Sequence, residues 1–169
     1  MQTLPPPTAL WSGGVRYVLL DRISTLQPPE LARGVKCVSL SDDIFVDHFP
    51  GHPVMPGALI IEAMAQLAGV LVEAAMRQRG RHDLHALLTM IDRAKFRHVV
   101  RPGDRLELEA KCTTVTEDGG QTQTWAKVDG QLAAEAQLTF VFAPVTNPVV
   151  LARRQEVLNV WLTGSAETP

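Results

Sequence analysis

The stretch PGALIIEAMAQLAGVLVEAAMRQRG, residues 56–80, decides the fold of this chain. Pro56 suits the first turn of a helix, and Gly80 suits the position just after its C-terminal end. Arg77 and Arg79 would lie in the last turn, where positive charge is favoured by the helix dipole. The segment is apolar on nearly every side, which predicts a helix that the rest of the chain buries.

One polar stripe interrupts this apolar helix. At about 100° per residue, the side chains of four residues fall within about 60° of one another. These residues are Glu62, Gln66, Gly69 and Glu73. The sequence therefore predicts a core helix with a single polar seam.

Short apolar segments on both sides of the helix predict strands. Residues 15–23 and 35–40 precede it, with the breaker QPPE at 27–30 between them. After the helix, residues 86–100, 105–115, 121–128 and 131–142 follow, and Asp-Gly pairs at 118–119 and 129–130 predict hairpins. An antiparallel sheet with one apolar face needs a cover, and the long helix is the available one. The expected fold class is α+β.

The length of 169 residues predicts one domain. We expect an N-terminal arm at 1–14, the domain at 15–142 and a C-terminal extension at 143–169. The extension carries an amphipathic stretch, VVLARRQEVLNVWL, that predicts a short helix.

Composition excludes several classes of function. A net charge of −2 and 5% aromatic residues disfavour nucleic-acid and membrane binding. Cys37 and Cys112 form no metal-ligand or disulfide pattern, which indicates two reduced thiols. No metal or cofactor is expected. The start, MQTLPPPTALW, lacks the basic region of a signal peptide, and the apolar run 63–72 is short for a membrane span. A cytoplasmic protein is expected.

The densest chemical signal is DHFPGHPVMPGALIIEAMAQ, residues 47–66. His48 lies in a loop stiffened by prolines and suits a general base near neutral pH. Gly57 lies in the first helical turn, where a free N–H can stabilise a developing oxyanion. Glu62 lies on an apolar helix, a setting that favours the protonated, proton-donating carboxyl. Taken singly, each residue has a structural alternative. His48 could be a loop histidine without a catalytic role, Glu62 a buried carboxyl with a hydrogen-bond partner, and Gly57 a glycine that only starts the helix. His52 is expected to be structural.

The same stretch resembles the signature of the hot-dog-fold 3-hydroxyacyl-acyl-carrier-protein dehydratases of the FabZ type, H-F-P-x-x-P-x-M-P-G-x-L-x-x-E-A-x-A-Q, at every fixed position. The resemblance extends over about residues 15–142. It implies that His48 is the base at C2, that Glu62 is the acid at the C3 hydroxyl, and that the Gly57 N–H binds the thioester carbonyl. Gln66 would orient Glu62 across one helical turn. Phe49 and Pro56 would join the substrate-binding part of the site.

The resemblance also implies a homodimer, or a trimer of dimers, with the histidine and the glutamate supplied by different subunits. A related dehydratase/isomerase branch carries Asp at the position of Glu62, which favours simple dehydration here. Asp47 departs from the small residue usual before the histidine, and it would hold a proton on the imidazole if it reached the ring. Together with the atypical Arg16-Tyr17 and the extension at 143–169, this leaves the acyl chain length and the pathway open.

Three cations, Arg93, Lys95 and Arg97, follow one another at every second position and would share one strand face. They are either a solvated face or a docking patch for an acidic acyl carrier protein. We expect dehydration of (3R)-3-hydroxyacyl thioesters on that carrier to trans-2-enoyl thioesters. The alternatives are a hot-dog acyl thioesterase and a non-catalytic subunit that binds the acyl carrier.

Overall fold

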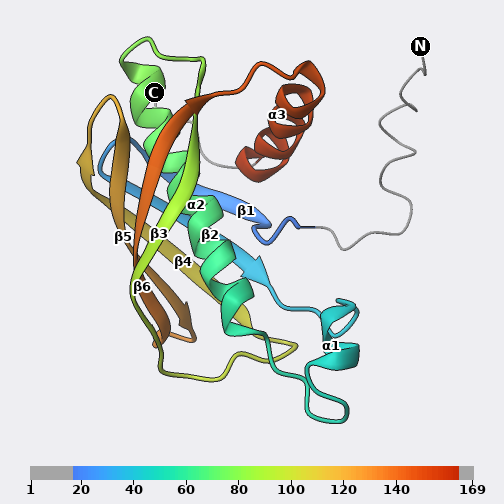
Figure 1. Ribbon diagram of the computed structural model, residues 1–169. Helices are drawn as coiled ribbons and strands as arrows, with labels where there is room; N and C mark the ends of the chain where they lie inside the picture. Colours follow the sequence, from blue (N-terminus) through green and yellow to red (C-terminus); the bar gives the residue numbers. More distant parts are fainter. Residues whose placement is uncertain (1–16, 164–169) are drawn as a thin grey trace, which may run out of the picture.

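The computed structural model describes residues 17–163. Six antiparallel strands form one sheet, in the order β1-β2-β4-β5-β6-β3, and the long helix α2 lies across one of its faces (Figure 1). This arrangement confirms the α+β hot-dog fold. The elements are β1 (Arg22–Gln27), β2 (Leu31–Cys37), α1 (Ile44–Asp47), α2 (Gly57–Gln78), β3 (Leu84–Phe96), β4 (Arg105–Val115), β5 (Gly119–Val128), β6 (Gln131–Pro144) and α3 (Pro148–Leu162).

Helix α2 confirms the prediction made from residues 56–80. Pro56 caps its N-terminus, and the chain leaves the helix at Arg79, just before Gly80 with its positive φ of 81°. Its length and composition would allow it to cross a membrane, but 78% of its most apolar window is buried inside the fold. The helix is therefore the core of the domain.

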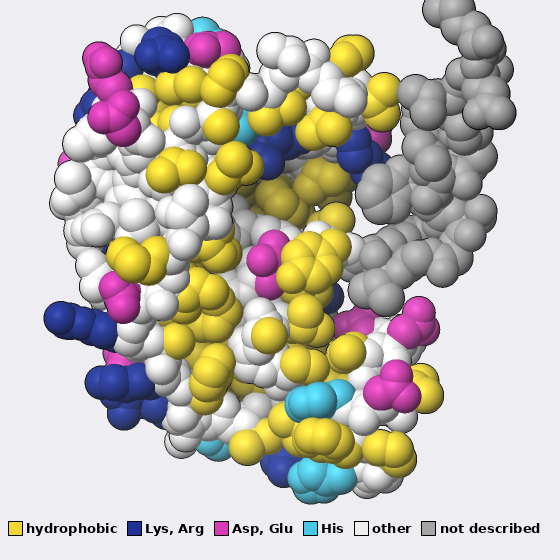
Figure 2. Space-filling view, viewed as in Figure 1, with side chains coloured by type: hydrophobic (Ala, Val, Ile, Leu, Met, Phe, Trp, Pro, Cys, Tyr) yellow, Lys and Arg dark blue, Asp and Glu magenta, His cyan; other side chains and the backbone are white. Residues whose placement is uncertain are grey.

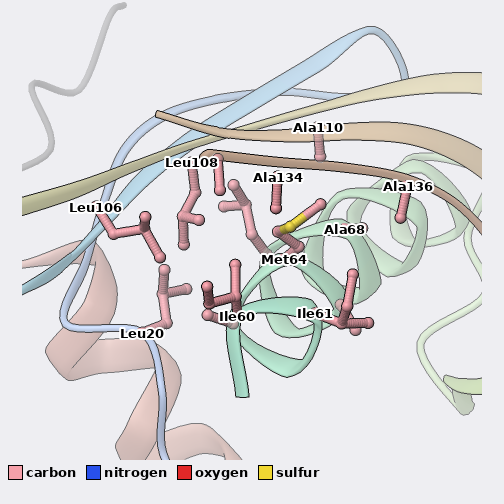
Figure 3. Close-up of a cluster of buried hydrophobic side chains, with 14 of the residues drawn as sticks. Leu20, Ile60, Ile61, Met64, Ala68, Leu106, Leu108, Ala110, Ala134 and Ala136 are labelled. Carbon is pink, nitrogen blue, oxygen red and sulfur yellow. The ribbon is translucent and has the colours of Figure 1, made fainter. Parts of the chain in front are cut away.

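Small side chains let this helix approach the sheet closely. Ala110, Ala134 and Ala136 on the strands are fully buried and face the helix beside Met64 and Ala68 (Figure 3). Alanine leaves room for the larger aliphatic side chains of α2 to pack at high density. The low aromatic content of the chain fits this close helix–sheet contact.

The predicted alternation along the later strands is present. On β4, Leu106, Leu108 and Ala110 are buried while their neighbours are more exposed, until a bulge after Cys112 ends the pattern. The Asp129-Gly130 pair turns between β5 and β6 with φ values of 49° and 78°. Both residues therefore adopt the positive φ that a tight two-residue hairpin requires.

The prediction of a strand at 15–23 is wrong for residues 17–21, while residues 15 and 16, like the predicted arm at 1–14, lie outside the described residues. Strand β1 begins only at Arg22, because the backbone of Tyr17 and Leu19 binds a helix side chain instead of a neighbouring strand. The second strand also lies earlier than expected: β2 is Leu31–Cys37, and not 35–40. The turn at 28–30, closed by the Glu30 N–H donating to the Gln27 carbonyl, sets this register.

Helix α3 follows β6 within the C-terminal extension. The Asn147 side chain accepts hydrogen bonds from the Val149 and Val150 N–H groups and so caps its N-terminus. Trp161 is buried and its indole N–H donates to the Leu20 carbonyl. The extension is thereby attached to the segment that leads into β1.

Candidate active site

His48 immediately follows the short helix α1. Its Nδ1 lies 2.7 Å from the Val54 carbonyl oxygen, and its ring stacks on Phe49 with 4.0 Å between ring centroids. A carbonyl can only accept, so Nδ1 carries the proton and, in the neutral ring, Nε2 has a free lone pair. The imidazole is therefore oriented with the lone pair of Nε2 available to accept a proton.

The loop that holds His48 is fixed by its own backbone. The Val54 N–H donates to the His48 carbonyl at 2.9 Å, and Phe49 and His52 exchange two backbone hydrogen bonds. The Met55 N–H donates to the Val100 carbonyl and ties the loop to the chain after β3. These bonds, with the prolines of the loop, make the position of the imidazole reproducible.

Neighbours of His48 take no part in this arrangement. Asp47 is exposed, and no contact between its carboxylate and the imidazole occurs within residues 17–163. His52 is exposed, and its Nε2 lies 3.4 Å from an Arg101 guanidinium nitrogen. Within the same range, no group of three or more His, Cys, Asp or Glu residues is placed to hold a metal ion.

Glu62 and Gln66 form the predicted contact one turn apart on α2. Gln66 Nε2 donates to Glu62 Oε1 at 2.9 Å and to the Tyr17 carbonyl at 3.1 Å, and Gln66 Oε1 accepts from the Leu19 N–H at 2.9 Å. The amide is thus held from both ends. Gln66 orients the carboxyl and also fastens the segment before β1 to the core helix.

Gly57 begins α2 against the ring of Phe96. A Cβ at this position would lie 2.8 Å from Cε1 and Cζ of that ring, closer than van der Waals contact allows. The Gly57 N–H is in the first helical turn and has no acceptor among residues 17–163. Pro56, the residue before it, has no N–H to compete for a substrate oxygen.

The polar seam predicted on α2 divides into two environments. Glu73 is 2% exposed, and it accepts from the Ala86 N–H at 2.7 Å and from the Arg154 guanidinium of α3. His85 Nδ1 lies 3.7 Å from the same carboxylate, and Arg77 lies 3.9 Å away. Glu73 therefore belongs to a buried ionic cluster and not to the candidate site.

A cavity of about 720 Å³ lies beside Glu62 and Gln66. Tyr17 and Val18 line it on one side and helix α3 on the other, and Figure 2 shows a recess with hydrophobic side chains between α3 and the body of the molecule. His48 does not line this cavity. Glu62 and His48 of one chain therefore do not share this cavity. Sequence reasoning missed the contribution of α3, because no spacing in its sequence relates it to Glu62.

The three candidate docking cations lie near the end of β3. The prediction of one shared strand face fails at Arg93, which has a φ of 51° and lies in a bulge between Asp92 and Lys95. Arg97 donates to Glu135 on β6 at 2.5 Å, and this hydrogen bond, with the charge of Arg97, lowers the pKa of Glu135. One of the three cations is thus already paired.

The sequence profile of the FabA-like domain matches residues 14–137, about three quarters of the chain. The chain belongs to the FabA-like family. Two relatives named 3-hydroxyacyl-[acyl-carrier-protein] dehydratase FabZ are similar to it: the Bacillus pumilus protein is 40% identical over 76% of this chain and 87% of its own, and the Syntrophotalea carbinolica protein is 43% identical over 76% and 86%.

Solved structures support the fold of this family member. The dehydratase heterocomplex ApeI:P from Xenorhabdus doucetiae matches with a TM-score of 0.63 at 17% identity, over 90% of this chain and 99% of that one. A hypothetical thioesterase with coenzyme A from Streptococcus pneumoniae matches with a TM-score of 0.58 at 10% identity, over 73% and 85%. At such identities these likenesses establish the hot-dog fold alone. Helix α3 lies beyond the residues that the FabA-like profile matches.

Proposed function

We propose that this protein removes water from (3R)-3-hydroxyacyl thioesters carried on an acyl carrier protein and yields trans-2-enoyl thioesters. The single observation that carries the proposal is the pair of oriented groups that elimination needs. Glu62 is held by Gln66 on an otherwise apolar helix, and His48 is fixed with Nε2 available. The relatives named above carry the same activity in their names.

The reaction follows from the roles of these groups. His48 Nε2 takes a proton from C2 while the thioester carbonyl oxygen accepts from the Gly57 N–H, which stabilises the developing enolate. The C3–O bond then breaks with its electron pair on oxygen, Glu62 gives that oxygen a proton, and water leaves. The protonated imidazole and the carboxylate regain their starting states by proton exchange. No metal or cofactor enters this scheme.

A homodimer supplies both groups to one substrate. Strand β3 is at an edge of the sheet and exposes a row of apolar side chains, an arrangement that favours pairing with a second strand. Since His48 does not line the cavity that contains Glu62 of its own chain, His48 of one protomer would act with the partner's Glu62. The exposed apolar residues on β3 are Leu87, Met90, Ile91 and Phe96.

The partner in the cytoplasm is an acidic carrier protein with a phosphopantetheine arm. Arg93 and Lys95 offer positive charge near Phe96, the ring that lies against Gly57. A carrier docked there would bring its thioester to the helix N-terminus. Because Arg97 is paired with Glu135, Arg93 and Lys95 carry more of the proposed docking than Arg97 does.

Mass spectrometry of a carrier protein loaded with a 3-hydroxyacyl chain tests the proposal. Loss of one water with the wild-type protein, abolished in His48→Ala and in Glu62→Gln, is the expected result. Both variants should keep the wild-type melting temperature, which separates chemistry from folding. Release of the free carrier thiol would instead indicate a thioesterase. Tight carrier binding with neither product would indicate a non-catalytic subunit.

A further inference from the structure

We propose that helix α3 forms one wall of the pocket for the acyl chain, so that its inward side chains set the chain length this enzyme accepts. The inference rests on the proposed dehydration and adds a specificity determinant outside the segment that the FabA-like profile matches. It starts from the cavity of about 720 Å³ beside Glu62, whose size suits a small-molecule ligand.

The direction of the substrate follows from the helix. The thioester carbonyl, C1, is assigned to a Gly57 N–H and the C3 hydroxyl to a Glu62 carboxyl, so the chain beyond C3 leaves the reacting atoms on the Glu62 side. The acyl chain beyond C3 must therefore continue past Glu62. The cavity that contains Glu62 and Gln66 opens there, and α3 lies on its other side.

The face of α3 toward this cavity suits hydrocarbon. Val149, Val150, Val157 and Trp161 line it, while Val160 of the same helix does not and is 66% exposed. These apolar side chains would bind an alkyl chain through desolvation, with Glu62 at the reactive end of the chain. The charged residues of α3 that also line the cavity are paired. Arg154 donates to the buried carboxylate of Glu73, and Arg153 donates to Glu156 at 3.0 Å.

Helix α3 is held in place at two positions. Arg154 binds Glu73 on α2, and the Trp161 indole N–H donates to the Leu20 carbonyl. These contacts tie α3 both to the core helix and to the segment before β1. A helix held in this way limits the length of the acyl chain, because a long chain could displace its side chains only by breaking the Arg154 and Trp161 contacts.

The experiment compares two variants of the same helix in the full-length protein. Val157→Phe narrows the cavity, and Val160→Phe adds the same volume on the exposed side. Initial rates are measured with carrier protein loaded with 3-hydroxybutanoyl or 3-hydroxydodecanoyl chains. For Val157→Phe we expect kcat/KM to fall about tenfold or more with the long chain and to change little with the short one. Val160→Phe should leave both values near those of the wild type.

If Val157→Phe does not fold, as judged by its melting temperature, Val150→Phe replaces it, because Val150 lines the same cavity and is half exposed. Unchanged chain-length selectivity in the folded variant overturns the inference while wild-type dehydration stands. An equal loss with both chains, accompanied by loss of the dimer on sizing, also overturns it and indicates that a second copy fills the cavity. No dehydration by the wild type would instead overturn the proposed function itself.

Discussion

Replacement of Arg154 by methionine should destabilise the protein by leaving a buried carboxylate short of its partner. Glu73 is 2% exposed, and breaking a buried ion pair by removing one member costs about 3–5 kcal/mol. Two features reduce the figure here. Glu73 keeps the Ala86 N–H at 2.7 Å, and the Arg154 side chain is itself 36% exposed and therefore partly screened by solvent. We expect a loss of about 2 kcal/mol, or about 4–8 °C in melting temperature for a chain of this size.

Urea unfolding followed by circular dichroism, at one fixed protein concentration, measures this loss for Arg154→Met, Glu73→Gln and the double variant. The sum of the losses in unfolding free energy of the two single variants should exceed the loss of the double variant, because either change removes the same interaction. Arg105→Met is the control, since Arg105 pairs with Glu107 at the exposed surface, and it should change little. Strict additivity of the two changes, or a loss for Arg154→Met no larger than that of the control, would refute the reasoning.

Three further outcomes are expected. Gly57→Ala should lower the dehydration rate about tenfold or more, because its Cβ displaces the ring of Phe96 from the helix N-terminus to which the thioester carbonyl is assigned. The melting temperature should change little, because that ring is half exposed. Wild-type rates would contradict the assignment of the Gly57 N–H to the carbonyl. Arg97→Gln should raise the pKa of Glu135 toward its ordinary value in an NMR titration. The wild-type pair stabilises the fold at neutral pH and that contribution is lost as the pH falls through the lowered pKa, so an unchanged Glu135 pKa would contradict the cause given. Ile91→Lys should yield monomers in light scattering that show no dehydration activity, and an active monomer would exclude a shared site.

The sequence alone determined the core helix, one side-chain contact on it and one of the strands. Residues 57–78 are apolar on nearly every side and bounded by Pro56 and Gly80, so local propensity and burial agree on one answer. The one-turn spacing of Glu62 and Gln66 likewise fixed their contact, because helix geometry places such side chains together. The alternation of apolar and polar residues at 105–115 likewise predicted strand β4.

Other features depended on tertiary contacts that no local pattern encodes. The segment at 17–19 is apolar enough for a strand, yet the Gln66 amide binds its backbone and keeps it out of the sheet. The bulge at Arg93 breaks an alternation that looked regular in the sequence.

The low aromatic content, which at first only excluded stacking functions, is explained by alanines that let α2 lie close to the sheet. The sequence by itself also predicted which groups could act as acid and base, since this prediction depends on residue type and local geometry. Only the tertiary structure decided that α3 borders the Glu62 cavity and that His48 lies outside it. The physical reason is that both depend on side chains from distant segments meeting in space, which is set by packing and buried ion pairs and not by spacing along the chain.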